Sequence, residues 1–369
     1  MTDVTDRRTL LAGAAGVGLL ALAGCGRPGD APRPSPSPTR TGPVVPRVAE
    51  TIVTGLSVPW GIAFLKDGRA IVGQRDRGTI SVIDPKAAEG KRVQELGTVP
   101  GVFAETGASR GLLGLALDPE DESQLYAFYT MATEQRIARI GLKAGKLGDI
   151  EPILTGIPTG KGHYGGQLVF GPDGHLYASV GDNQRVPSPG QDRDSLAGKI
   201  LRITKDGKPA KANPFDSEVW SWGHRNIEGL AFDDAGRLWA TEFGADLADE
   251  LNLITKGANY GWDVHEGASD DPKYKAPKVT WPVADCSPAG IAITQGTAFV
   301  AALRGQRLWA VPLNGDRTGK PRAHFVEEFG RLRAVAVAPD GSLWLGTSNT
   351  DGNGKPRAGD DRILRVVLD

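Results

Sequence analysis

Short apolar segments and polar turns alternate along most of the chain, and one arrangement of them recurs. An apolar segment of strand pattern is followed by a turn with Pro, Asp or Gly, and then by a second apolar segment. Asp-Gly and related pairs supply the positive φ angles of tight hairpins, so each copy predicts a β-hairpin. Six copies are visible, at residues 61–73 (GIAFLKDGRAIVG), 114–128 (GLALDPEDESQLYAF), 166–180 (GQLVFGPDGHLYASV), 229–241 (GLAFDDAGRLWAT), 290–302 (GIAITQGTAFVAA) and 334–346 (AVAVAPDGSLWLG).

The spacing of the copies predicts the fold. Counted between Phe64, Leu117, Phe170, Phe232, Ile293 and Val337, the spacing is 44 to 62 residues. Four short strands with their loops fill such a length, and repeated four-stranded units build β-propellers. The helical period is nearly absent after residue 47. We therefore predict an all-β fold, a six-bladed β-propeller spanning residues 47–369.

The N-terminal part of the chain differs from this pattern. Residues 1–25 contain twin arginines and a short apolar stretch, and they end in Leu-Ala-Gly-Cys. This resembles a bacterial lipoprotein signal of twin-arginine type, with Cys25 as the lipidated residue, although an ordinary secretory signal and the general export route stay open. Residues 26–46 are rich in Pro, Ser and Thr and predict an extended tether. We expect an exported protein held at the outer face of the cell membrane by its lipid anchor only.

Composition adds two exclusions. Lys and Arg number 43 and Asp and Glu 44, a net charge of −1, so no basic surplus favours nucleic acid as a partner. The predicted mature body contains one cysteine, Cys286, and so cannot form an internal disulfide.

The segments between the copies differ from one another, and they carry the polar side chains. They include GIPTGKGHYGG before the third copy, VGDNQ after it, WSWGHRNIEG before the fourth and EFGADLADELNLITKGANYGW after it. Loops at one end of the central channel supply the ligand sites of propellers. We expect a polar pocket there.

In these segments the chain resembles a known family. GKGHYGGQLVFGPDGHLYASVGDN, SWGHRNIEGLAF and DELNLITKGANYGW are similar to the soluble glucose/sorbosone dehydrogenases, the quinoprotein aldose sugar dehydrogenases. The resemblance covers residues 50–369 in order, one motif per blade. Members of this family are six-bladed propellers that use pyrroloquinoline quinone (PQQ) and calcium. The resemblance implies an enzyme that oxidises aldose sugars at C1 to lactones and passes electrons to an external acceptor.

The resemblance also implies roles for individual residues. His163 corresponds to the general base for the C1 hydroxyl, a role that suits an imidazole. Asp182 corresponds to the carboxylate that orients this base. The positions that match PQQ contacts are Arg225, Asn226, Arg304, Arg331 and Arg333, and arginine forks suit the carboxylates of PQQ. The positions that match calcium ligands are Gly244 and Ala245, through their carbonyls, with Glu250 and Tyr260.

Four positions depart from the family pattern. Ser109 stands where glutamine is common, Gln167 where arginine is frequent, Arg304 where many members have lysine, and Ala334 where aspartate is usual. These departures bear on contacts with substrate and cofactor more than on the fold. Two alternatives therefore stay open: a non-catalytic envelope lipoprotein that binds sugar or protein, and a calcium-dependent hydrolase of lactonase type.

Overall fold

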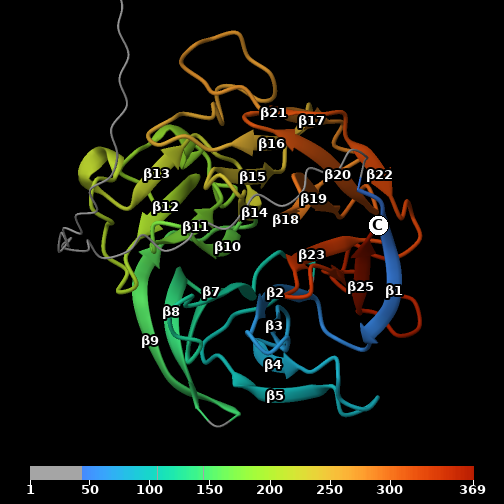
Figure 1. Cartoon of the computed structure of the whole chain (residues 1–369). Coiled ribbons are helices and arrows are strands. Elements are labelled where there is room, and N and C mark those ends of the chain that lie inside the picture. The colour runs from blue at the N-terminus through green and yellow to red at the C-terminus, as the bar shows by residue number, and fades with distance from the viewer. Residues whose placement is uncertain (1–43, 106, 144) are drawn as a thin grey trace, which may run out of the picture. The chain divides into compact units, whose positions relative to one another are not determined.

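The computed structural model describes residues 44–369 except 106 and 144, and it builds them almost entirely from β-strands (Figure 1). The predicted lipoprotein signal with Cys25, and the predicted tether up to residue 43, lie outside the described residues. The first strand begins at Pro46, one residue before the predicted start of the body. In the described part of the chain, no helix is long and apolar enough to cross a membrane.

The described strands form six antiparallel sheets around a central axis, which confirms the predicted six-bladed β-propeller (Figure 1). The innermost strands contact one another in a closed ring, in the order β2, β6, β10, β14, β18, β23 and back to β2. The first blade consists of β2 (Pro59–Phe64), β3 (Ala70–Gln74), β4 (Thr79–Ile83) and β5 (Val93–Thr98). The second consists of β6 (Leu112–Leu117), β7 (Gln124–Thr130), β8 (Gln135–Lys143) and β9 (Lys146–Ile157). The third consists of β10 (Gly165–Phe170), β11 (Leu176–Val180), β12 (Lys199–Ile203) and β13 (Val219–Trp222). The fourth blade consists of β14 (Ile227–Phe232), β15 (Leu238–Glu242), β16 (Asp249–Leu253) and β17 (Val279–Trp281). The fifth consists of β18 (Pro288–Thr294), β19 (Thr297–Ala302), β20 (Arg307–Asn314), β21 (Arg317–Thr318) and β22 (Arg322–His324). Two short 3-10 helices, η1 (Pro189–Gln191) and η2 (Pro214–Asp216), lie in the loops of the third blade.

The sixth blade joins the two ends of the described chain. It contains β23 (Leu332–Val337), β24 (Leu343–Thr347) and β25 (Ile363–Leu368), and its outermost strand is β1 (Pro46–Val53). β1 pairs antiparallel with β25, from Pro46 opposite Leu368 to Val53 opposite Ile363. The backbone hydrogen bonds of this pair close the ring of blades, because they hold the first strand of the body to the last (Figure 1).

Glycines at the start of the repeats allow the inner ring to close tightly. A Cβ atom on Gly61 would lie 2.7 Å from the backbone nitrogen of Leu115, and one on Gly290 would lie 2.7 Å from the carbonyl oxygen of Arg333. Gly114 faces the carbonyl of Gly166 in the same way. The glycine that opens most copies of the repeat is thus required by the approach of the next innermost strand.

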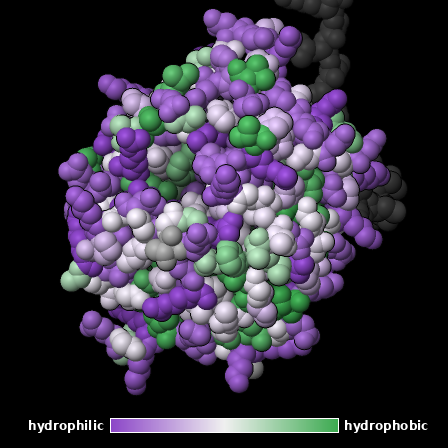
Figure 2. Space-filling model, turned by 180° about the vertical axis from the view of Figure 1, so that it is seen from behind, coloured by the Kyte–Doolittle hydropathy of each residue, from purple (hydrophilic) through white to green (hydrophobic). Residues whose placement is uncertain are grey.

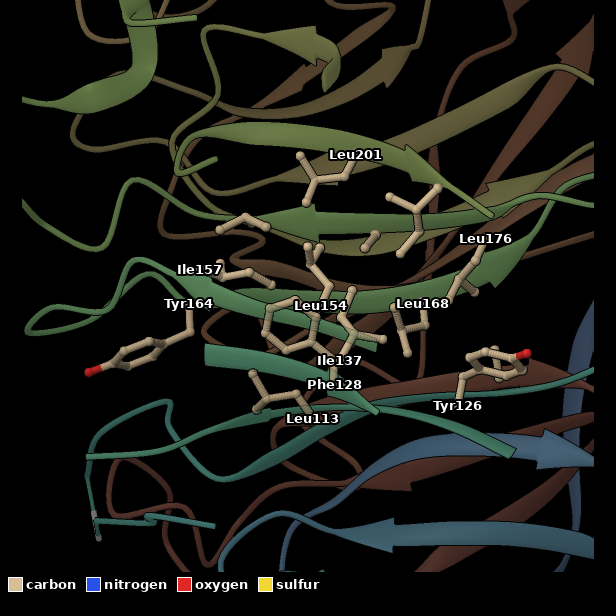
Figure 3. Packing of buried hydrophobic residues seen from close by; sticks show 14 of the residues in the cluster. Leu113, Tyr126, Phe128, Ile137, Leu154, Ile157, Tyr164, Leu168, Leu176 and Leu201 are labelled. Atoms are coloured by element: carbon tan, nitrogen blue, oxygen red, sulfur yellow. The ribbon is translucent and has the colours of Figure 1, made fainter. Parts of the chain in front are cut away.

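The core lies between the blades. Figure 3 shows one of its clusters, in which Phe128 and Ile137 of the second blade lie opposite Leu176 and Leu201 of the third. Because a blade is covered on both faces, its middle strands are buried throughout, and the five residues of β11 and of β12 are all buried. The face opposite to that of Figure 1 is mostly hydrophilic, with hydrophobic side chains in small separate patches (Figure 2).

Candidate active site

Pairing within the blades brings the predicted site loops to one end of each sheet. Gly165, the first residue of β10, pairs with Val180, the last of β11, so the loop with His163 lies beside the loop with Asp182. Ile227 pairs with Glu242 in the fourth blade, which places Arg225 beside the loop that begins at Phe243. The backbone N–H of Asp182 donates to the carbonyl of Arg225 at 2.8 Å and joins the two blades there.

His163 and Asp182 form a hydrogen-bonded pair. The Nδ1 atom of His163 lies 2.7 Å from Oδ1 of Asp182, and the carboxylate is almost fully buried. His163 has a φ of +52°, unusual for a non-glycine residue, and its carbonyl accepts from the N–H of Asn183. A Cβ on Gly181 would collide with that carbonyl, so the glycine before Asp182 allows the two loops to meet.

Three N–H donors surround the carboxylate of Asp182. Oδ1 accepts from His163 and from the backbone N–H of Gln184 at 2.9 Å, and Oδ2 accepts from Nε1 of Trp262 at 2.7 Å. Burial alone would raise the pKa of Asp182, but the hydrogen bonds from His163, Gln184 and Trp262 outweigh it and lower the pKa. Asp182 is therefore an ionised acceptor, and His163 must donate through Nδ1.

This arrangement leaves Nε2 of His163 as the acceptor nitrogen. The amide nitrogen of the exposed Gln184 side chain lies 3.1 Å from it and donates to it. A hydroxyl group in place of this amide would donate its hydrogen bond to the lone pair of Nε2, the atom that would then accept its proton. The geometry is therefore that of a general base.

Arg225 lies next to this pair with an unused hydrogen-bonding atom. Its backbone N–H donates to Glu242 at 2.6 Å, and one terminal guanidinium nitrogen donates to the carbonyl of Phe243 at 3.3 Å. Its guanidinium carbon lies 5.3 Å from the centre of the Trp262 ring. The Nε atom of Arg225 is buried and has no partner among the described residues, and burial lowers the pKa of the guanidinium. A buried cation with a free donor is suited to bind an anion.

Asn226, the next predicted cofactor contact, bonds to residues of two neighbouring blades. Its side chain is buried, its Oδ1 accepts from the N–H of Gly165 at 3.1 Å, and its amide nitrogen lies 3.5 Å from Glu228. The side chain thus links the starts of β10 and β14.

The loop with Gly244 and Ala245 is organised by two carboxylates. The N–H of Gly244 donates to Asp249 at 2.9 Å. One oxygen of Glu266 accepts from four successive backbone N–H groups, of residues 245–248, at 2.7 to 3.2 Å. Burial raises the pKa of Asp249 to about 6.

Glu250 and Tyr260 lie around the same small cavity as Arg225 and Gly244. Glu250 accepts from Gly267 and from the amide of Asn252, and burial together with the nearby Glu242 raises its pKa. The ring of Tyr260 stacks on His224 at 4.6 Å, and its hydroxyl donates to the carbonyl of Leu253 at 2.7 Å. Across the described residues, no three side chains of His, Cys, Asp or Glu are arranged to hold a metal ion.

The predicted second arginine pair meets a buried carboxylate. Asp351 lies 3.0 Å from Arg331 and 3.6 Å from Arg333, and Arg333 also pairs with Glu228. Burial alone would raise the pKa of Asp351, but the two arginines lower it. Arg304, before β20, is exposed and makes no ion pair within the described part of the chain.

A cavity of about 300 Å³ occupies the central channel. It is lined by the innermost strands, and Gln167, Glu228, Arg333 and Ala334 are among its lining residues. Two of the positions that depart from the family pattern, Gln167 and Ala334, therefore face the channel. Ser109 is partly buried in the loop before β6.

Several residues of this region were not predicted as site residues. Trp262 is part of the motif GANYGW, but the sequence predicted no role for it. No sequence pattern distinguishes Gln184, Glu266 and Asp351 from surface residues. Trp262 is 80 positions from Asp182, Glu266 is 18 to 21 positions from the N–H groups that it accepts from, and Asp351 is 20 positions from Arg331. Only the fold brings such pairs together.

Comparisons with known proteins identify the family of this chain. The glucose/sorbosone dehydrogenase family profile matches residues 56–364. The PQQ-bound aldose sugar dehydrogenase of Streptomyces coelicolor is 44% identical and superposes with a TM-score of 0.84, covering 90% of this chain and 99% of its own. An uncharacterised protein of Synechocystis, slr1608, is 33% identical over 82% of this chain and 84% of its own, and the aldose sugar dehydrogenase YliI of Escherichia coli is 28% identical over 82% and 90%. By sequence and by fold, the chain belongs to the glucose/sorbosone dehydrogenase family.

Proposed function

We propose that this protein oxidises aldose sugars at C1 to lactones, with PQQ as its cofactor and an external acceptor for the electrons. The observation that carries the proposal is the His163–Asp182 pair, which leaves an accepting imidazole nitrogen beside the buried, incompletely bonded Arg225. Similarity to the PQQ-bound enzyme of Streptomyces coelicolor supports it. Similarity to the aldose sugar dehydrogenase of Escherichia coli supports the substrate class.

His163 performs the proton transfer in this proposal. The proton of the C1 hydroxyl goes to Nε2, the C1–H bond breaks with its electron pair leaving as hydride, and the C1–O bond becomes a carbonyl. The neighbouring Asp182 carboxylate stabilises the imidazolium and holds Nδ1 as the donor. PQQ, when bound, supplies the two-electron acceptor for the hydride.

The residues present fit a planar, multiply anionic cofactor. Nε of Arg225 is a buried donor without a partner among the described residues, and a carboxylate would satisfy it. We propose that Arg225 holds one carboxylate of PQQ, with Asn226 as a further contact and with Arg331, Arg333 and Arg304 contributing positive charge. Arg331 and Arg333 would share their charge with Asp351, whereas Arg304 is free to turn toward a ligand.

We propose calcium as the second cofactor, bound by the carbonyls of Gly244 and Ala245, with Glu250 and Tyr260 at a further site. The chemistry of the donors supports this, because calcium prefers carboxylate and carbonyl oxygens. Oδ1 of Asn252 is buried next to Glu250 and has no partner among the described residues, so an acceptor there is left over for a cation. A cation at the carbonyls of Gly244 and Ala245 would polarise a bound quinone, and one beside Glu250 would relieve the repulsion between Glu242 and Glu250.

The experiment is reconstitution of the purified body with PQQ and Ca²⁺, followed by dye reduction with a panel of aldoses. We expect turnover that requires both additions and stops with EGTA. PQQ at 100 times its Kd should also stabilise the fold by about 2.7 kcal/mol. His163→Ala should abolish turnover and keep PQQ bound. A folded protein that neither binds PQQ nor reduces dye would contradict the proposal.

For the N-terminal part we propose export and lipidation at Cys25, with residues 26–46 as the tether. The lipobox-like sequence before Cys25 supports this. Detergent partitioning of the wild-type chain and of Cys25→Ala tests it. Equal partitioning of both into the aqueous phase would refute it.

A further inference from the structure

Trp262 lies between the two groups on which the proposed function depends. Its indole Nε1 donates to Oδ2 of Asp182 at 2.7 Å, and its ring faces the guanidinium of Arg225 at 5.3 Å. One side chain therefore contacts the carboxylate that orients the base and also the cation that is free to bind an anion.

The backbone of Trp262 is held from two sides. Its N–H donates to the carbonyl of Gly223 at 2.9 Å, and its carbonyl accepts from the side-chain amide of Gln191 at 2.7 Å. Gly190 approaches that carbonyl so closely that a Cβ would collide with it. The buried ammonium group of Lys199 fixes this loop by donating to the carbonyls of Pro189 and Gly190 at 2.9 and 3.2 Å. The indole is therefore placed by the scaffold.

The two oxygens of Asp182 have unequal partners. Oδ1 accepts two hydrogen bonds, from His163 and from the backbone of Gln184, whereas Trp262 is the donor for Oδ2. Without the indole N–H, Oδ2 would be buried with no partner from the described residues, and the carboxylate could rotate about its Cβ–Cγ bond. Rotation would loosen the bond from His163 Nδ1, which sets the tautomer of the imidazole.

The ring of Trp262 acts on Arg225 by a different interaction. A guanidinium near an aromatic ring is attracted to it, and the attraction is larger when the pair is removed from water. Burial lowers the pKa of Arg225, as expected for a guanidinium removed from water. Its Nε has no partner among the described residues, so few contacts fix the direction of the side chain. The indole is one of them.

We propose that Trp262 is a positioning residue that couples the base to the anion-binding arginine. It holds Asp182, and through it His163, by its N–H, and it holds Arg225 by its ring. This inference rests on the proposed function for its kinetic consequences, but the contacts themselves exist without PQQ.

Two substitutions separate the two contacts. Trp262→Phe removes the N–H and keeps an aromatic ring, and Trp262→Leu removes both. Trp309→Phe is the matched control, because it removes an indole N–H bond from the fifth blade to the backbone carbonyl of Asp285, away from the site. Thermal unfolding of each variant verifies that it is folded.

The first measurement needs neither PQQ nor activity. The chain has five histidines, so two-bond ¹H–¹⁵N spectra of the labelled imidazoles can be assigned with a His163→Gln variant. We expect His163 of the wild type to carry its proton on Nδ1, and Trp262→Phe to show a mixture of tautomers. An unchanged His163 signal in Trp262→Phe would overturn the proposal for the base.

The second measurement uses the loaded enzyme. Trp262→Phe should lower kcat by about 10- to 100-fold, the usual effect of losing a group that orients a functional imidazole, with a smaller change in KM and in the affinity for PQQ. Trp262→Leu should weaken PQQ binding in addition. Values equal to those of Trp309→Phe in all three quantities would refute the coupling.

Two further outcomes are covered by the design. If Trp262→Phe does not fold, Asp182→Ala tests the same contact from the other side, because it removes both carboxylate oxygens and one indole N–H signal should shift and exchange faster; unchanged indole signals would refute the contact. If the wild type neither binds PQQ nor oxidises aldoses, the proposed function fails, while the tautomer comparison still decides the role of Trp262.

Discussion

Asp182→Asn is the substitution for which the structure makes the sharpest kinetic prediction. The carboxylate accepts from three N–H donors, on His163, Gln184 and Trp262, at 2.7 to 2.9 Å. An asparagine has the same shape but one oxygen and one NH₂ group, so in either orientation its NH₂ faces at least one of these donors. The folded structure should persist with a hydrogen bond lost and the charge removed.

The expected loss of rate follows from these contacts. With the NH₂ toward His163, the imidazole must accept at Nδ1 and carry its proton on Nε2, which is then unable to act as a base. With the NH₂ toward Trp262, His163 keeps its tautomer but lacks the charge that stabilises the imidazolium; hydrogen bonds to charged groups are worth about 1 kcal/mol more than neutral ones. A positioned general base contributes about 10²- to 10⁴-fold, so we expect kcat to fall by about 100-fold or more in the first orientation and by about 5-fold in the second.

The assay is dye reduction by the PQQ- and Ca²⁺-loaded protein, with PQQ affinity measured separately. PQQ binding should change little, because Arg225 keeps its contacts. The control is Asp173→Asn, in the turn between β10 and β11. This substitution removes the ion pair between Asp173 and Arg202 of β12 and leaves the site loops unchanged. If Asp182→Asn stays within 3-fold of Asp173→Asn in kcat, the assignment of Asp182 to the base is refuted.

The remaining predictions concern stability. Asp351→Asn should lower the free energy of unfolding by about 3 kcal/mol at pH 7 in urea titrations, because Arg331 loses its carboxylate partner and Arg333 keeps only Glu228. Since the pKa of Asp351 is lowered in the folded state, its stabilisation is complete above the ordinary value of 3.8 and is lost as the pH falls through the folded-state pKa. The difference between wild type and variant should therefore shrink on acidification below pH 4, and a constant difference would contradict this account. Gly114→Ala should cost about 1–3 kcal/mol by the same measurement, because its methyl group meets the backbone of Gly166. Gly141→Ala is the control and should change the free energy of unfolding little, because the nearest atom lies 3.9 Å from the added carbon. If both substitutions changed the free energy of unfolding equally, the inner ring would have room for the methyl group at Gly114.

The sequence predicted the repeated unit and the position of the site loops. Alternating apolar segments around turns such as Pro-Asp-Gly and Asp-Gly specify hairpins locally, and their recurrence specifies a ring of blades, because each unit must bury both faces against its neighbours. The family motifs placed His163 and Asp182 at the end of the third blade, and the structure brings them within 2.7 Å. The structure leaves the calcium ligands and the PQQ contacts as proposals.

Tertiary structure alone decided the partners of these residues. Trp262 is 80 positions from Asp182, and Arg333 is 105 positions from Glu228, and no local pattern links such pairs. The sequence by itself determined which segments form strands and which loops carry polar chemistry, since both depend on near neighbours in the chain. The meeting of adjacent blades decided which donor reaches which carboxylate, because hydrogen bonds act over distances that only the closed ring establishes. It also decided that Arg331 and Arg333 share Asp351, and that Nε of Arg225 is left without a partner among the described residues.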